Sequence, residues 1–279
     1  MFLLTDFGTT DELAGVVRAV VLREAPGCPV VDLTHEIPLF DVRAGALALE
    51  RAVPHLGPGV VVAVVDPEVG TDRRAIAVEV ASRDGPRFLV GPDNGIIGFA
   101  TDLLGGVARA VELPPAAARS ASGATFDGRD VFAPAAARLW AGRDLEDLGV
   151  PIDAGTLRRL EVPKLEVRQG EIQAEVLWVD RFGNVQLAAR PSDAEASGLS
   201  SELVVASGHV RLTARSSASF SGALAAAVMA ETAAPEVLRL IVDSNGRLAL
   251  VRRRDSAAAV LRASAGDVIS VRNGEGPLR

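Results

Sequence analysis

Three polar clusters in the first half of the chain carry side chains that could do chemistry. They are residues 5–8 (TDFG), 66–73 (DPEVGTDR) and 92–95 (PDNG), and each follows an apolar run. Their carboxylates can accept hydrogen bonds from a polar ligand. Each cluster alone could equally be a turn, a helix cap or a surface ion pair, because Asp, Asn, Gly and Pro favour turns. Three clusters at one edge of a sheet would favour a binding or catalytic site, without specifying a reaction.

The elements around these clusters alternate between strands and helices. Helices are expected from a capping box at Thr9 and Glu12 to about residue 24, and over residues 42–53 and 130–140. Short apolar runs typical of strands occupy residues 2–4, 29–33, 60–65, 75–80 and 88–90. This alternation predicts an α/β domain with a largely parallel central sheet. In such sheets ligands bind beyond the carboxyl ends of the strands, which is where the three clusters fall.

The second half of the chain has a different residue pattern. Residues 149–163 contain Pro151, Gly155 and Pro163 in a charged stretch, which is typical of a linker. Beyond it, strand-like segments occupy residues 165–167, 172–178, 185–188, 203–205, 210–213, 238–242 and 248–251. Short strands separated by turn signals predict a smaller β-barrel or sandwich. We therefore expect two domains, over residues 1–158 and 163–279.

Composition narrows the functional classes. The formal charge is −7 and the one basic run, residues 252–254, is short, so we expect no nucleic-acid partner. The single cysteine, Cys28, excludes an intramolecular disulfide and a cysteine-built zinc site, and the three histidines show no ligand spacing, so no metal is expected. The chain shows neither a basic leader nor an apolar run of membrane-spanning length, so we expect a cytoplasmic protein without membrane contact.

Familiar catalytic motifs are absent from the sequence. It contains no G-x-G-x-x-G after a strand, no G-x-x-x-x-G-K-[ST] and no G-x-S-x-G, which argues against a dinucleotide enzyme, a P-loop NTPase and a serine hydrolase. Residue patterns alone therefore lead to an α/β enzyme or ligand-binding protein with a β appendage.

Five ordered motifs carry a resemblance to a known family. They are LLTDFGTTD at 3–11, VVDPEVGTDRRAI at 64–76, GPDNG at 91–95, TFDGRDVFAP at 125–134 and VDRFGNVQL at 179–187. Over nearly its whole length the chain resembles the S-adenosylmethionine hydroxide adenosyltransferases, hydrolytic relatives of the fluorinase and chlorinase. The resemblance implies an N-terminal α/β domain, a C-terminal β-barrel and a homotrimer with active sites between subunits. It implies no cofactor.

The same resemblance assigns substrate contacts to residues of both domains. Asp6 should accept hydrogen bonds from the two ribose hydroxyls, since a carboxylate has two oxygens to offer. The other substrate-binding candidates are Phe40 and Phe126 around the ribose, Asn184, Phe182 and Phe220 at the adenine, Asp180, Asp11 and Ser244 at the methionine end, and Asn94 in the third cluster. Without the resemblance, residues 180–184 would be interpreted as an ordinary hairpin turn.

The implied reaction is in-line attack of water or hydroxide on the ribose 5′ carbon of S-adenosylmethionine, which expels methionine. The family handles water with an Asp, an Arg and a His, and Asp66 and Arg73 match the first two. A carboxylate at Asp66 would repel a halide, and the chain lacks the tyrosines that line a halogenase site, so a halogenase is disfavoured.

One position departs from the family pattern. Where the family has its histidine, this chain has Asp127. Asp127 could replace the imidazole by sharing a proton with Asp66 beside Arg73, or it could point away and leave those two to position water. We favour the first. Loss of the histidine also supports an alternative of another class, a non-catalytic protein that binds S-adenosylmethionine or adenosine.

Overall fold

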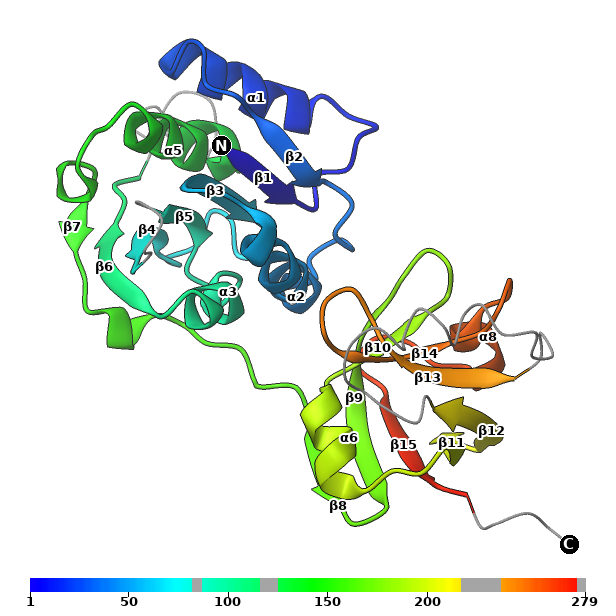
Figure 1. Ribbon diagram of the computed structural model, residues 1–279. Helices are drawn as coiled ribbons and strands as arrows, with labels where there is room; N and C mark the ends of the chain where they lie inside the picture. Colours follow the sequence, from blue (N-terminus) through cyan, green and yellow to red (C-terminus); the bar gives the residue numbers. More distant parts are fainter. Residues whose placement is uncertain (82–86, 116–124, 217–236, 275–279) are drawn as a thin grey trace, which may run out of the picture. The chain divides into compact units, whose positions relative to one another are not determined.

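The computed structural model describes residues 1–81, 87–115, 125–216 and 237–274. By its internal contacts the chain divides into two compact units, residues 1–161 and 162–279 (Figure 1). Among the described residues, no helix is both long enough and apolar enough to cross a bilayer.

The first unit contains a seven-stranded sheet of order β2-β1-β3-β5-β4-β6-β7. Its strands are β1 (Phe2–Thr5), β2 (Val31–Thr34), β3 (Gly59–Val64), β4 (Ala75–Val80), β5 (Arg87–Pro92), β6 (Val107–Glu112) and β7 (Val150–Pro151). The pairings among β2, β1, β3 and β5 are parallel, whereas β4, β6 and β7 join antiparallel. The connection from β4 to β5 is too short for the crossover that parallel neighbours require. The predicted α/β class is confirmed.

Helices cover both faces of this sheet (Figure 1). The helices α1 (Leu13–Glu24) and α5 (Ala133–Trp140) share one buried apolar cluster with the sheet, and α2 (Val42–Ala52) and α3 (Gly98–Leu103) share another. Alternate residues of β3 enter the two clusters, which explains why its sequence is apolar throughout. The short helical turns are η1 (Val53–His55), η2 (Gly128–Phe132), η3 (Leu145–Asp147) and η4 (Ala154–Thr156).

The predicted capping box at the start of α1 is wrong. The helix begins at Leu13, and its N-cap residue, Glu12, makes no side-chain cap hydrogen bond. The Thr9 hydroxyl instead donates to Glu36 Oε1 at 2.9 Å. A tertiary partner therefore competes successfully with the local cap, and residues 6–12 remain a loop.

The second unit is a closed β-barrel, which confirms the predicted barrel. Seven strands follow the order β10-β14-β13-β12-β11-β15-β9, and a β9–β10 pairing closes the ring while β8 adds to β9. The strands are β8 (Leu165–Arg168), β9 (Glu171–Val179), β10 (Val185–Leu187), β11 (Glu202–Ser207), β12 (Val210–Ser216), β13 (Leu238–Val242), β14 (Leu248–Val251) and β15 (Val268–Asn273). In the described part of this unit, two short helices accompany the strands, α6 (Pro191–Ser197) and α8 (Ala257–Leu261).

Candidate active site

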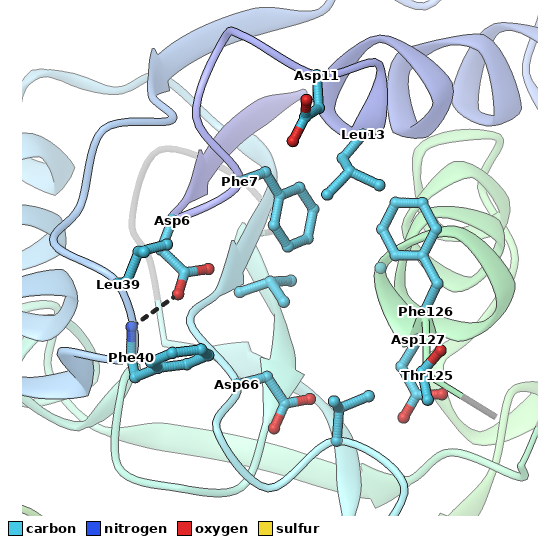
Figure 2. A pocket seen from close by; sticks show the side chains of 13 residues that line it. Asp6, Phe7, Asp11, Leu13, Leu39, Phe40, Asp66, Thr125, Phe126 and Asp127 are labelled. Atoms are coloured by element: carbon cyan, nitrogen blue, oxygen red, sulfur yellow. Dashed lines mark hydrogen bonds between the residues drawn. The ribbon is translucent and has the colours of Figure 1, made fainter.

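A cavity of about 270 Å³ lies in the first unit where β1 and β3 end. Because these strands are parallel, their carboxyl ends meet at the same edge of the sheet. Figure 2 shows the 13 side chains that line it. They include six residues that the sequence analysis proposed for the site: Asp6, Asp11, Phe40, Asp66, Phe126 and Asp127.

A buried arginine joins two of these carboxylates. Arg73 Nε lies 3.0 and 3.1 Å from the two oxygens of Asp66, and Arg73 Nη2 also bonds to Asp66 Oδ2. The same Nη2 donates to Asp127 Oδ2 at 2.6 Å. The exposed fractions of the three side chains are only 7% for Asp66, 2% for Arg73 and 3% for Asp127. The structure thus brings together all three predicted catalytic residues, and Asp127 points toward Arg73 rather than away.

Arg73 stays positively charged in this environment. Burial by itself lowers the pKa of Arg73, but hydrogen bonds and charge from Asp66 and Asp127 outweigh burial and raise that pKa above its ordinary value. The Phe132 ring adds a cation–π contact, with its centroid 5.3 Å from Cζ. Arg73 therefore remains a cation that can hold two acidic groups side by side.

A π-helical turn places Asp127 and Phe126 at the cavity. Asp127 is the residue before η2, which has the wide π geometry that frequently occurs at functional sites. Phe7 and Phe126 pack edge to face with their centroids 5.5 Å apart. A Cβ on Gly128 would lie 2.9 Å from Phe7 Cζ and 3.1 Å from Phe126 Cε2, so this position favours glycine. Phe7 and Gly128 are cavity residues that the sequence analysis missed, although both stand inside its quoted motifs.

Asp6 lines the cavity and binds the backbone of Phe40. Its Oδ2 accepts the backbone N–H of Phe40 at 3.0 Å, a bond drawn in Figure 2. Phe40 has a φ of +65°, a conformation that costs a bulky residue energy and often marks a functional position. Phe40 is 66% exposed and the neighbouring Leu39 is 72% exposed. Asp6 therefore holds the backbone of an exposed aromatic residue beside the cavity.

Two other predicted residues of the first unit have different settings. Asp11 lines the cavity just before α1 but is exposed at its rim. Asn94 is buried and is not among the cavity-lining residues of the described chain. Its side-chain amide instead donates to the Val65 carbonyl at 2.8 Å.

In the second unit, the predicted Asp180, Phe182 and Asn184 form the β9–β10 turn. Asp180 Oδ1 accepts the backbone N–H groups of Phe182 at 2.8 Å and Asn184 at 2.9 Å, and Asp180 Oδ2 accepts the Asn184 side-chain amide at 2.8 Å. Phe182 projects from the turn with 74% of its surface exposed. The turn is thus internally bonded and presents one aromatic ring to the outside.

The β13–β14 turn repeats this architecture. Asp243 Oδ1 accepts the backbone N–H groups of Asn245 at 2.8 Å and Arg247 at 3.0 Å, as Asp180 does in its own turn. The predicted Ser244 lies exposed in this turn. Phe220, another predicted contact, lies outside the described residues. Among the residues that the structure describes, no group of three or more His, Cys, Asp or Glu side chains could hold a metal ion.

Comparison with known proteins identifies the family. Residues 1–149 match the SAM hydroxide adenosyltransferase N-terminal domain, and residues 174–270 match the C-terminal domain of the same family. An (R)-S-adenosyl-L-methionine hydrolase of Salinispora arenicola is 50% identical over 186 residues, which cover 66% of this chain and 70% of the relative.

Two further proteins are similar to this chain. The crystal structure of an uncharacterized conserved protein from Thermotoga maritima superposes with a TM-score of 0.84 at 30% identity, covering 98% of this chain and 99% of that one. A fluorinase of an Actinoplanes species is more distant, at 25% identity over 70% of this chain and 73% of the relative. The chain therefore belongs to the SAM hydroxide adenosyltransferase family.

Proposed function

We propose that this protein hydrolyses S-adenosylmethionine to adenosine and methionine. The observation that carries the proposal is the buried Arg73 guanidinium, which bridges Asp66 and Asp127 beside a cavity lined by carboxylates and phenylalanines. Relatives at 50% and 46% identity are named (R)-S-adenosyl-L-methionine hydrolases. Since those names specify the R epimer, we propose that this chain also prefers the R configuration at sulfur.

In the proposed reaction, a water oxygen attacks the ribose 5′ carbon in line with the carbon–sulfur bond. As the oxygen–carbon bond forms, the carbon–sulfur bond breaks and its electron pair returns to sulfur, so methionine leaves as a neutral thioether. The proton of the water passes to a carboxylate and later to solvent. The step balances without a cofactor, because the sulfonium is already an activated leaving group. The protein must orient the water and accept one proton.

The roles of the three catalytic residues follow from their contacts. Asp127 takes the place of the family histidine, and Asp66 or Asp127 accepts the proton of the attacking water. Arg73 holds both carboxylates in fixed positions before substrate arrives. Preorganised charges of this kind need little rearrangement during the reaction.

The substrate contacts of the first unit are part of the same proposal. Asp6 accepts hydrogen bonds from the ribose hydroxyls, and Phe40 and Phe126 pack against the sugar. Asp11 faces the ammonium group of the methionine. Their common position around one cavity supports these roles.

We further propose that residues 1–158 act as the catalytic domain and residues 163–279 supply adenine and methionine contacts to a neighbouring copy in a homotrimer. Asn184, Phe182 and Phe220 would then contact adenine, and Asp180 and Ser244 the methionine. The 74% exposed Phe182 ring supports a role in contacting another molecule. The proposed location is the cytoplasm. Light scattering during size-exclusion chromatography tests the trimer, and a monomer at assay concentration would contradict it.

The decisive test is an incubation with each sulfonium epimer of S-adenosylmethionine, with and without chloride, in water enriched in oxygen-18. Hydrolysis gives methionine and adenosine with the label on the 5′ oxygen. A 5′-chloro product would indicate a halogenase. Intact substrate despite measurable binding would favour the non-catalytic alternative, which the missing histidine supports. Asp66→Asn serves as the inactive control.

A further inference from the structure

The motif at the end of β5, residues 91–95, contacts both ends of the loop that carries Asp66 and Arg73. At the first end, the buried Asn94 donates its side-chain amide to the carbonyl of Val65 at 2.8 Å. Val65 directly precedes Asp66 in the chain. The other side of the same amide, Asn94 Oδ1, accepts the Ile96 N–H at 3.2 Å. Asn94 therefore links the start of the loop to the turn that follows β5.

At the second end, Asp93 binds Arg74, which directly follows Arg73. The Asp93 N–H donates to the Arg74 carbonyl at 2.9 Å, and Asp93 Oδ2 accepts Arg74 Nε at 2.9 Å. The Asp93 side chain is only 3% exposed, and its other oxygen accepts the Arg158 N–H at 2.8 Å. Each polar atom of this carboxylate thus has a defined partner.

The motif can do this because it lies unusually close to β3. A side chain on Gly91 would collide with the carbonyl oxygen of Ala63 on β3. The strands β3 and β5 are paired directly, with Val62 opposite Val90. Asp93 and Asn94 are therefore carried by the strand adjacent to the one from which the loop departs.

We propose that Asp93 and Asn94 are positioning residues that set the geometry of the Asp66–Arg73 pair without contacting substrate. The inference rests on the proposed hydrolase function for its kinetic readout only. Asp66 and Arg73 are seven residues apart in the chain, on a loop with a left-handed glycine at Gly70. Anchors at residues 65 and 74 restrict both ends of that loop. Misplacement of a catalytic group by about 1 Å can reduce the rate by about 100-fold.

The test compares Asn94→Leu and Asp93→Asn with a matched control on the same strand. Arg87, at the opposite end of β5, also donates to backbone carbonyls, those of Val53 at 3.2 Å and Leu56 at 2.9 Å. Arg87→Met therefore removes comparable bonds far along the strand from the loop. For each protein we would measure kcat, KM, the Kd for adenosine and the melting temperature.

For Asn94→Leu we expect kcat to fall by about 100-fold, with the adenosine Kd changed less than about threefold. The control is expected to lower the melting temperature while keeping kcat of the folded protein. Retention of kcat in a folded Asn94→Leu protein would overturn the proposal, as would a loss of adenosine affinity that matches the loss of rate, because that result marks a substrate contact.

If the wild-type protein turns over no substrate, the hydrolase proposal fails, and the positioning role is then decided by crystal structures of the variants. Loss of the two-pronged Asp66–Arg73 contact in Asn94→Leu would support positioning. An unchanged contact would overturn it. The same crystal structures test the positioning role if a variant is too unstable for the kinetic assay.

Discussion

The cavity of the first unit contains aspartates predicted to be catalytic, and the β9–β10 turn of the second contains one predicted to bind substrate, but the two regions hold these carboxylates differently. Asp66 and Asp127 share a buried arginine, and each side chain is less than a tenth exposed. Among the described residues, the hydrogen bonds of the Asp180 side chain stay within a five-residue turn, beside an exposed phenylalanine. A buried charge cluster is sensitive to any change in its members, whereas a surface turn tolerates change. Substitutions in the two regions should therefore separate chemistry from binding.

The largest effect is expected for Arg73→Met. This change leaves two buried carboxylates without the guanidinium that they share, so we expect kcat to fall by at least about 100-fold and the free energy of unfolding to fall by about 3–5 kcal/mol. Urea denaturation and steady-state kinetics measure the two losses. Arg168→Met is the control, because Arg168 and Glu166 form an ion pair whose side chains are 65% and 59% exposed. If Arg168→Met lowered the free energy of unfolding as much as Arg73→Met does, burial of the carboxylates would not explain the loss of stability.

The next effect concerns Asp127. If it shares the proton-accepting role, Asp127→Asn should lower kcat by about 10²–10⁴-fold and change the pH–rate profile, while Asp127→His, which introduces the histidine that the family resemblance implies, should retain activity. Because the pKa of Arg73 is raised above its ordinary value, Arg73 stays protonated over the pH range of the assay. Its deprotonation therefore causes no fall of the rate on the alkaline side of the pH–rate profile. An unchanged rate and profile in Asp127→Asn would exclude Asp127 as a base.

A smaller effect is expected in the second unit, where two turns of the same architecture can be compared. Asp180→Ala and Asp243→Ala each remove two carboxylate-to-backbone hydrogen bonds, which should lower the free energy of unfolding by about 1–3 kcal/mol in both cases. KM should rise more for Asp180→Ala, because only Asp180 is proposed to hold the methionine ammonium. Equal KM values would assign Asp180 to the turn alone.

The smallest effect on stability is expected for Phe182→Ala. Its side chain is 74% exposed, so the free energy of unfolding should change by no more than about 0.5 kcal/mol. If the ring packs on adenine in a neighbouring copy, KM should still rise, with kcat little changed. Thermal melts and initial rates check both expectations, and an unaltered KM would remove Phe182 from the proposed site.

Much of the architecture could be predicted because it depends on local patterns. The apolar run at residues 60–65 predicted a strand, and the structure forms β3 there, with alternate residues in two separate clusters. The bounds of β13 and β14 agree with the expected segments. The cap at Thr9 failed for the opposite reason, because Glu36, 27 residues away, takes its hydroxyl. The antiparallel direction of β4 likewise depends on tertiary structure, because it is set by the pairing with β5.

Local residue patterns were enough to predict the class of fold, the family motifs and an aspartate at the position where the resemblance implies a histidine. The contact of Asp127 with Arg73 across 54 residues of chain, and the bond of Asn94 to the backbone beside Asp66 instead of a place in the cavity lining, depend on the tertiary structure. Strand and helix patterns are encoded over a few neighbouring residues. The distance between side chains far apart in the chain depends instead on how the sheet is ordered and how its loops are anchored.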